Sequence, residues 1–106
     1  MSTQYTRDQE KKGLFGVLSR CIEIGDLSAL KRIVDREMVD ISKIQNAKKS
    51  TLLHVAAKYN RERIVMYLME AGASMHQQNR RNECPYFIAV ARGSRRVLRY
   101  MEAMMK

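Results

Sequence analysis

Histidine and cysteine are the residues of this chain that could hold a metal ion or act as nucleophiles, and each occurs only twice. Cys21 and Cys84 lie far apart, and the sequence contains no Cys-x-x-C pair. A structural zinc site takes four ligands, and His54 and His76 form no cluster with the cysteines at ligand spacing. We therefore expect no metal site. Cys21 falls on an apolar helical face, where we expect it to be a small buried residue.

The motifs of common enzymes are also missing from the sequence. It contains neither Gly-x-Ser-x-Gly nor His-Glu-x-x-His, and no pair of acids that would fit a cleft. The segment Gly13-Leu14-Phe15-Gly16 lacks the Gly-Lys-Ser/Thr ending of a phosphate-binding loop and is typical of a helix start. A catalytic site needs converging groups that this sequence does not offer. We expect no catalytic activity and no cofactor.

The chemistry that remains is electrostatic. The chain has 20 basic and 11 acidic residues, a formal net charge of +9 at pH 7. The excess lies almost wholly in the second part of the chain. Up to Asn46 there are 8 basic and 7 acidic residues, and from Ala47 onward there are 12 and 4. A field of this asymmetry favours acidic partners and speeds their encounter.

Composition indicates an intracellular protein. No apolar run is long enough for a membrane-spanning helix, and Met1 to Lys12 lack the apolar stretch of a signal peptide. Two distant cysteines do not make the disulfide framework of a small secreted domain. We expect a reducing compartment, either nucleus or cytoplasm. Residues 1–12 are polar without an apolar period, so we expect them to form a flexible lead.

Helical spacing begins after this lead. Five apolar or small residues share one helical face: Leu14, Val17, Leu18, Cys21 and Ile22. Gly25 is suited to ending that helix, and Asp26 to capping the start of the next one. The sequence therefore predicts a pair of helices joined by a tight turn.

The chain also repeats itself. When it is shifted by 33 residues, residue class is kept at many pairs, among them Gln45 with Gln78, Ala56 with Ala89 and Leu68 with Met101. The segment from Ile22 to Leu30 matches Ala57 to Val65 at a shift of 35 residues, so the first unit carries two extra residues. A sustained period of 33 is the spacing of ankyrin repeats.

The middle unit carries motifs that resemble that family. The segment Thr51-Leu52-Leu53-His54-Val55-Ala56-Ala57 is similar to the Thr-Pro-Leu-His-x-Ala-Ala signature that opens an ankyrin repeat. The segment from Ile64 to Ala73 resembles its second helix and closing Gly-Ala, and Cys84-Pro85-Tyr86-Phe87-Ile88-Ala89 resembles a degenerate copy of the signature. The resemblance covers about residue 13 to the end. It implies an all-α solenoid of about three helix-turn-helix units, approximately 13–46, 47–79 and 80–106, joined by β-turn fingers.

The repeat pattern also predicts the elements. We expect helices over residues 13–24, 27–36, 52–59, 62–71, 85–92 and 95–104, with extended fingers over 37–51 and 72–84. Gly72 is suited to a positive φ at a helix end. Cys84 replaces the capping Thr51 and is a poorer cap. The resemblance gives His54 a structural role, with hydrogen bonds within and between neighbouring turns, and His76 the role of a turn residue.

Ankyrin proteins usually hold partners on a concave surface formed by fingers and first helices. The resemblance therefore implies a non-catalytic adaptor or scaffold, and the charge implies that its partner is an acidic segment of another protein. Tyr59 and Arg81 are the foremost candidates, because Tyr and Arg are enriched at interface hot spots. Arg95, Arg96 and Arg99 are expected on the convex side. The full set of predicted contact residues is Lys48, Lys49, Val55, Lys58, Tyr59, Arg80, Arg81, Ile88 and Arg92.

Two other hypotheses remain open. The basic surface could bind nucleic acid or anionic lipid, although no aromatic platform alternates with the basic residues. Alternatively, the C-terminal end could pair with a partner or with a second copy, because a terminal repeat needs a polar outer face. Four residues at that end are apolar and do not provide a polar outer face: Leu98, Met101, Met104 and Met105. The same feature fits the N-terminal piece of a longer ankyrin protein.

Overall fold

The computed structural model describes the backbone of residues 7–105 and the side chains of residues 13–105. Its six helices are α1 (Arg7–Ile24), α2 (Leu27–Glu37), α3 (Leu52–Lys58), α4 (Glu62–Glu70), α5 (Pro85–Arg92) and α6 (Arg95–Met104). Between residues 7 and 105 the only β pairing is an isolated bridge of Gln45 with Thr51. The predicted all-α fold is confirmed.

The helix boundaries agree with the predicted ones to within one residue at every end but one. The exception is α1, which begins at Arg7 rather than at residue 13. The period of apolar residues starts only at Leu14, so it gave no signal for the earlier turns. The predicted flexible lead over residues 1–12 lies partly outside the described residues, since residues 1–6 are not among them.

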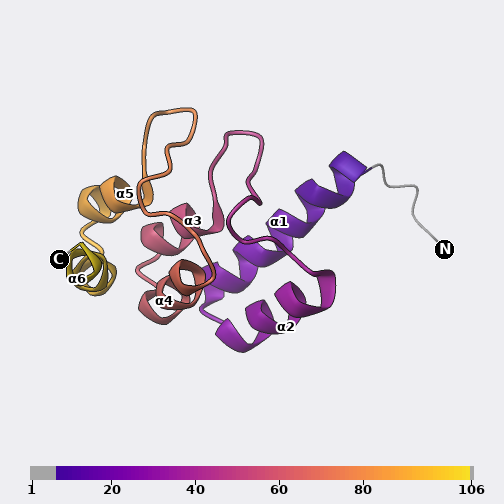
Figure 1. Cartoon of the computed structure of the whole chain (residues 1–106), viewed down its shortest axis with the longest axis horizontal. Helices are drawn as coiled ribbons and strands as arrows, with labels where there is room; N and C mark the ends of the chain where they lie inside the picture. The colour runs from indigo at the N-terminus through magenta and orange to yellow at the C-terminus, as the bar shows by residue number, and fades with distance from the viewer. Residues whose placement is uncertain (1–6, 106) are drawn as a thin grey trace.

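The helices form three antiparallel pairs that stack side by side (Figure 1). The first helices α1, α3 and α5 pack in one layer, and α4 packs on α6 in the other, beside α2. Two long loops, residues 38–51 and 71–84, project from the stack as neighbouring fingers (Figure 1). We call them the first and second finger, and we call the helix pairs units one, two and three.

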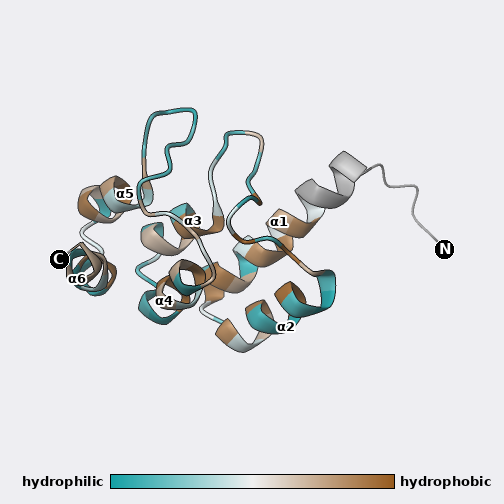
Figure 2. Cartoon of the chain, viewed as in Figure 1, coloured by the Kyte–Doolittle hydropathy of each residue, from teal (hydrophilic) through white to brown (hydrophobic). Residues whose placement is uncertain are grey.

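All six helices contribute buried apolar residues to one core, while the fingers are mostly hydrophilic (Figure 2). The core is densest around α3, where five of seven residues are buried. Ala56 and Ala57 are fully buried there, and their small side chains let α1 and α5 approach α3 from both sides. Cys21 is buried as predicted. Met101 is fully buried as well, so its predicted place in an exposed C-terminal end surface is wrong.

The turn between the two helices of each unit has the same backbone geometry. Gly25, Asn60 and Gly93 occupy equivalent positions and have φ values of 80°, 57° and 67°. These values lie in the left-handed region, which Gly and Asn adopt most readily. Gly72, at the end of α4, has a φ of 108°, as predicted.

Hydrogen bonds to backbone carbonyls join each unit to the one before it. Arg61 begins α4 without capping it, and its guanidinium donates to the carbonyls of Ile22 and Glu23 at the end of α1. Ser94 begins α6 in the same way, and its Oγ donates to the carbonyl of Ala57 at 2.7 Å. Two different side chains therefore make the same connection. Each joins the start of the second helix of one unit to the end of the first helix of the unit before it.

Two asparagines in equivalent positions shape the fingers. In the first finger, Asn46 Oδ1 accepts the backbone N–H groups of Lys48 and Ser50 at 2.9 and 3.0 Å. In the second finger, Asn79 Oδ1 accepts those of Arg81 and Glu83 at 2.9 and 3.1 Å. Asparagine favours such turns because its short side chain can bond the backbone two residues on.

His54 ties unit two to the second finger. Its Nδ1 accepts the backbone N–H of Thr51 at 3.0 Å, which completes a capping box at the start of α3. Its Nε2 therefore carries the proton and donates to the carbonyl of Glu83, 2.7 Å away. Burial lowers the pKa of His54, and the contact with Glu83 opposes this only in part. The predicted structural role is confirmed, and His76 lies in an exposed turn as predicted.

We predict that Ser94→Ala destabilises the fold by about 1 kcal/mol, because it removes a buried hydrogen bond and leaves the carbonyl of Ala57 without that donor. Urea unfolding monitored by circular dichroism measures the change. Ser28→Ala is the matched control, since Ser28 is an exposed residue of α2. Equal stability of the two variants would show that the Ser94 contact does not hold units two and three together.

We also predict that the fold loses stability as the pH falls below the ordinary histidine pKa of about 6.5. The lowered pKa of His54 means that the unfolded chain binds this proton more readily, so the contribution is complete above that pH and lost below it. Urea unfolding between about pH 7.5 and about pH 5 measures the slope. His54→Asn should flatten the slope and His76→Gln should keep it. A slope that is unchanged in His54→Asn would contradict the assignment.

Candidate functional site

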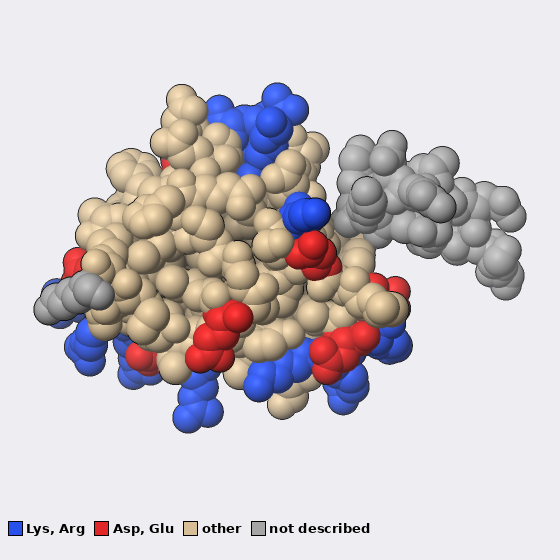
Figure 3. Space-filling model, viewed as in Figure 1, with Lys and Arg blue, Asp and Glu red and all other residues tan. Residues whose placement is uncertain are grey.

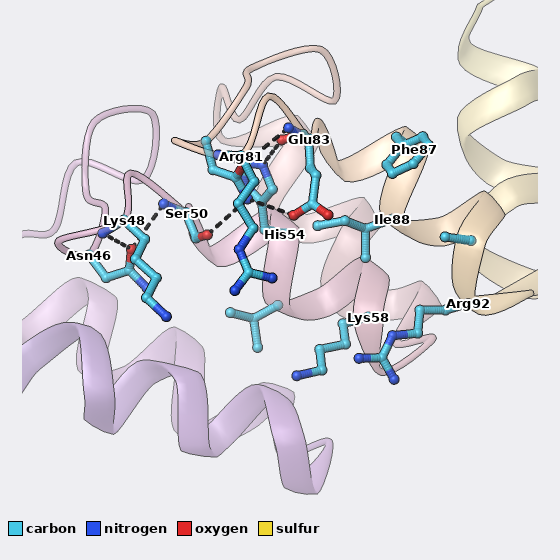
Figure 4. A pocket seen from close by; sticks show the side chains of 13 residues that line it. Asn46, Lys48, Ser50, His54, Lys58, Arg81, Glu83, Phe87, Ile88 and Arg92 are labelled. Carbon is cyan, nitrogen blue, oxygen red and sulfur yellow. Dashed lines mark hydrogen bonds between the residues drawn. The ribbon is translucent and has the colours of Figure 1, made fainter.

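One groove lies between the two fingers and the exposed faces of α3 and α5 (Figure 4). We call it the concave groove. Both units two and three contribute to it, and so do both fingers. Its lining residues are Asn46, Lys48, Ser50, His54, Val55, Lys58, Asn79, Arg81, Glu83, Phe87, Ile88, Ala91 and Arg92.

Four cationic side chains line this groove. Lys48 and Arg81 come from equivalent positions of the two fingers, and Lys58 and Arg92 come from the last turns of α3 and α5. In Figure 4 the charged ends of Lys58 and Arg92 lie together at the helix side of the groove. Among the side chains of residues 13–105 the one ion pair joins Arg36 to Glu37, which is far from these residues in the fold. The groove is therefore an electropositive surface.

Most of the polar lining residues are occupied with structural hydrogen bonds. Asn46 and Asn79 hold the finger turns, and Asn79 Nδ2 also donates to Ser50 Oγ at 3.2 Å and to Glu83 Oε1 at 3.3 Å. His54 is neutral because burial lowers its pKa. Glu83 is the one acidic residue of the lining. These residues shape the groove, and most of their hydrogen-bonding groups are already used within the fold. The four cations are therefore the main polar groups that could bind a ligand.

The structure brings together six of the nine predicted contact residues. They are Lys48, Val55, Lys58, Arg81, Ile88 and Arg92. Their role in binding stays a prediction, but the placement of both finger cations beside the first helices agrees with the repeat pattern.

The other three predicted residues lie outside the groove. Arg80 is engaged in the fold, since its Nε donates to the carbonyl of Ala47 at 2.9 Å and its backbone N–H to that of Lys48 at 2.9 Å. Lys49 sits in the tip of the first finger, with a φ of 62°. Tyr59 caps the end of α3, and Lys58 Nζ lies 5.5 Å from its ring centroid. Figure 3 shows basic side chains gathered over the fingers.

Phe87 is the lining residue that sequence analysis missed with the greatest consequence. It lies on α5 and remains 52% exposed. The repeat shift aligns it with His54, which is 2% exposed, so the period gives no sign of this exposure. The available signal was the residue type itself, a phenylalanine at the position that His54 holds in the middle unit.

The predicted C-terminal end surface is smaller than expected. Leu98 is half-buried against the core, and Met101 is fully buried. Met104 and Met105 remain exposed at 53% and 44%. Only these two methionines of the predicted set therefore present a large apolar surface at that end.

The His, Cys, Asp and Glu residues lie dispersed in the part of the chain that the structure describes. There, no group of three or more His, Cys, Asp or Glu residues is placed to hold a metal ion. Burial raises the pKa of the Cys21 thiol and Asp26 adds to this effect, so Cys21 lacks the thiolate character of a ligand or nucleophile. None of the helices in this part combines the length and the hydropathy that crossing a membrane requires.

A solved structure has a similar fold. The chain resembles one chain in the complex of a predatory endopeptidase from Bdellovibrio bacteriovorus with an immunity protein, with a TM-score of 0.74 and 24% sequence identity. The match covers 81% of this chain and 44% of that one, so this chain spans less than half of its length.

The family comparison agrees with the helix pairs. The family model described as ankyrin repeats in three copies matches residues 18–103, which contain α2 to α5 whole, the last turns of α1 and all of α6 but its last residue. Ankyrin repeats generally serve as protein-binding modules. Because the match spans most of the sequence and its three copies correspond to the three helix pairs, this chain belongs to the ankyrin-repeat family.

Proposed function

We propose that the concave groove binds an acidic segment of a partner protein, and that the chain acts as an adaptor without catalytic activity of its own. The observation that carries this proposal is the set of four cations in one groove. Lys48, Lys58, Arg81 and Arg92 share it with a single acidic residue, Glu83. The carboxylate of Glu83 already accepts from Asn79, so it does not neutralise the surface.

The electrostatic repulsion among these four cations favours binding of a negatively charged partner. Like charges placed close together repel, and the folded stack holds these four on adjacent units because the repeat geometry sets their positions. Carboxylates of a partner would relieve that repulsion and would gain charge-assisted hydrogen bonds from the two guanidinium groups. Complementary charge of this kind mainly sets which partner is chosen and how fast it is met.

Nucleic acid and anionic lipid fit the same charge less well. On the face shown in Figure 3, the basic residues along the outer helices alternate with acidic ones rather than forming an unbroken strip. The groove contains one aromatic side chain, Phe87, whereas single-stranded nucleic acid is bound on several stacked aromatics. We therefore keep these ligands as outcomes of the binding test.

We predict that the double variant Lys48→Glu/Arg81→Glu binds a short fluorescent peptide rich in Glu and Asp at least about tenfold more weakly than the unmodified chain. Fluorescence anisotropy at physiological salt measures the affinity. Both side chains are exposed and the fold uses only their backbone groups, so the variant should keep its helical circular dichroism. Arg80 is left unchanged because it joins the two fingers.

The matched control is Arg95→Glu/Arg99→Glu, which alters the net charge equally on exposed residues of α6 outside the groove. At physiological salt, charges beyond about 8 Å are largely screened, so the control should keep most of the affinity. Equal losses in the two variants would show attraction to net charge alone. Random-sequence duplex DNA that binds more tightly than the peptide under the same conditions would favour the nucleic-acid hypothesis.

A further inference from the structure

Phe87 departs from the repeat pattern at a position where the preceding unit makes a polar contact. In unit two the equivalent residue is His54, which donates from Nε2 to the carbonyl of Glu83 in the next finger. Phenylalanine can neither donate nor accept such a bond. Gly93 shows the same change, because its counterpart Asn60 accepts the backbone N–H of Val97 at 3.2 Å and glycine has no side-chain oxygen.

Phe87 is left half exposed inside the concave groove. Its exposed fraction is 52%, and it lines the groove together with Ile88, Ala91 and Arg92 of the same helix. Residues four apart lie on one helical face, so Phe87 stands over Ala91 and Ile88 over Arg92. Val55, at the position of α3 equivalent to Ile88, adds a further half-buried apolar side chain to the lining.

The apolar floor, formed by Val55, Phe87, Ile88 and Ala91, lies beside the cations of the groove, with Phe87 at the end away from Lys48 (Figure 4). Lys48 and Arg81 reach the groove from the fingers, and Lys58 and Arg92 reach it from the ends of α3 and α5 (Figure 4). An exposed aromatic side chain is costly to leave in water and gains free energy when a partner covers it. A ligand that carried only carboxylates would satisfy the cations and leave this floor uncovered.

We propose that Phe87 and Ile88 form an apolar anchor site in the groove, so that the partner segment carries a large apolar side chain beside its acidic residues. This inference rests on the proposed function and specifies the partner's chemistry: the carboxylates bind the four cations, and the apolar side chain covers Phe87. Aromatic anchors that are buried at the centre of a contact and surrounded by polar residues contribute a large share of binding energy in protein interfaces.

Two fluorescent peptides test the anchor. Both are short and rich in Glu and Asp, and they differ at one central position, where one has Leu and the other Ser. The unmodified chain should bind the Leu peptide about tenfold more tightly, the expected scale for burying a leucine side chain on an apolar floor. Anisotropy measures both affinities at the same salt concentration.

Variants of α5 then locate the effect. Phe87→Ala should abolish the preference for Leu, and Phe87→Leu should restore it. Val90→Ala is the matched control, because Val90 is 50% exposed on the same helix but does not line the groove. It should keep the preference. Circular dichroism verifies that each variant folds.

The outcomes separate this inference from the proposed function. Equal affinity of the unmodified chain for the two peptides would overturn the anchor and leave acidic-segment binding intact. Binding of neither peptide would overturn both. Equal loss of preference in Phe87→Ala and Val90→Ala would also overturn the anchor, since it would show a general effect of α5. Light scattering in which the chain alone is a dimer and Phe87→Ala a monomer would overturn it too, because a second copy would then cover Phe87.

Discussion

The whole stack depends on the packing of α3 between α1 and α5. This helix has seven residues, too few to be stable alone, and five of them are buried by neighbours on both sides. The contact needs small residues, and Ala56 and Ala57 supply them. Because no unit can bury its own apolar face, the geometry of this central helix fixes where the units before and after it lie.

The packing also brings polar side chains close to neighbouring units. Two classes of polar residue result, those that bond a neighbouring unit and those that extend into the groove. Arg61, Ser94 and His54 direct their side chains to backbone carbonyls of an adjoining unit, and each contact serves the stack itself. Lys48 and Arg81 form no such side-chain contact in the described structure and extend into the groove. Residues of this second class can therefore change without loss of the fold, and they are the ones in which a binding preference can be encoded.

The repeat period allowed most of the fold to be predicted, because equivalent positions in successive units have the same structural role. The helix ends, the role of His54 and the buried Cys21 all followed from position within the unit. The start of α1 did not, since residues before Leu14 lack the apolar period on which the prediction relied. Arg80 was assigned to binding because charge on a finger gives no sign of whether a guanidinium faces solvent or a neighbouring carbonyl.

Phe87 and Met101 show what the same period predicts at the last unit and what it does not. Met101 was placed on an exposed end because it lies in a terminal repeat, although exposure in a stack depends on what lies on either side of a residue. Met101 matches the fully buried Leu68 and is itself fully buried, because α6 packs on α4 and α5. Phe87 matches buried His54, yet its ring is half exposed and lines the groove. The period therefore predicts the inward face of a unit well. The open flank has to be inferred from departures such as a phenylalanine in place of a histidine.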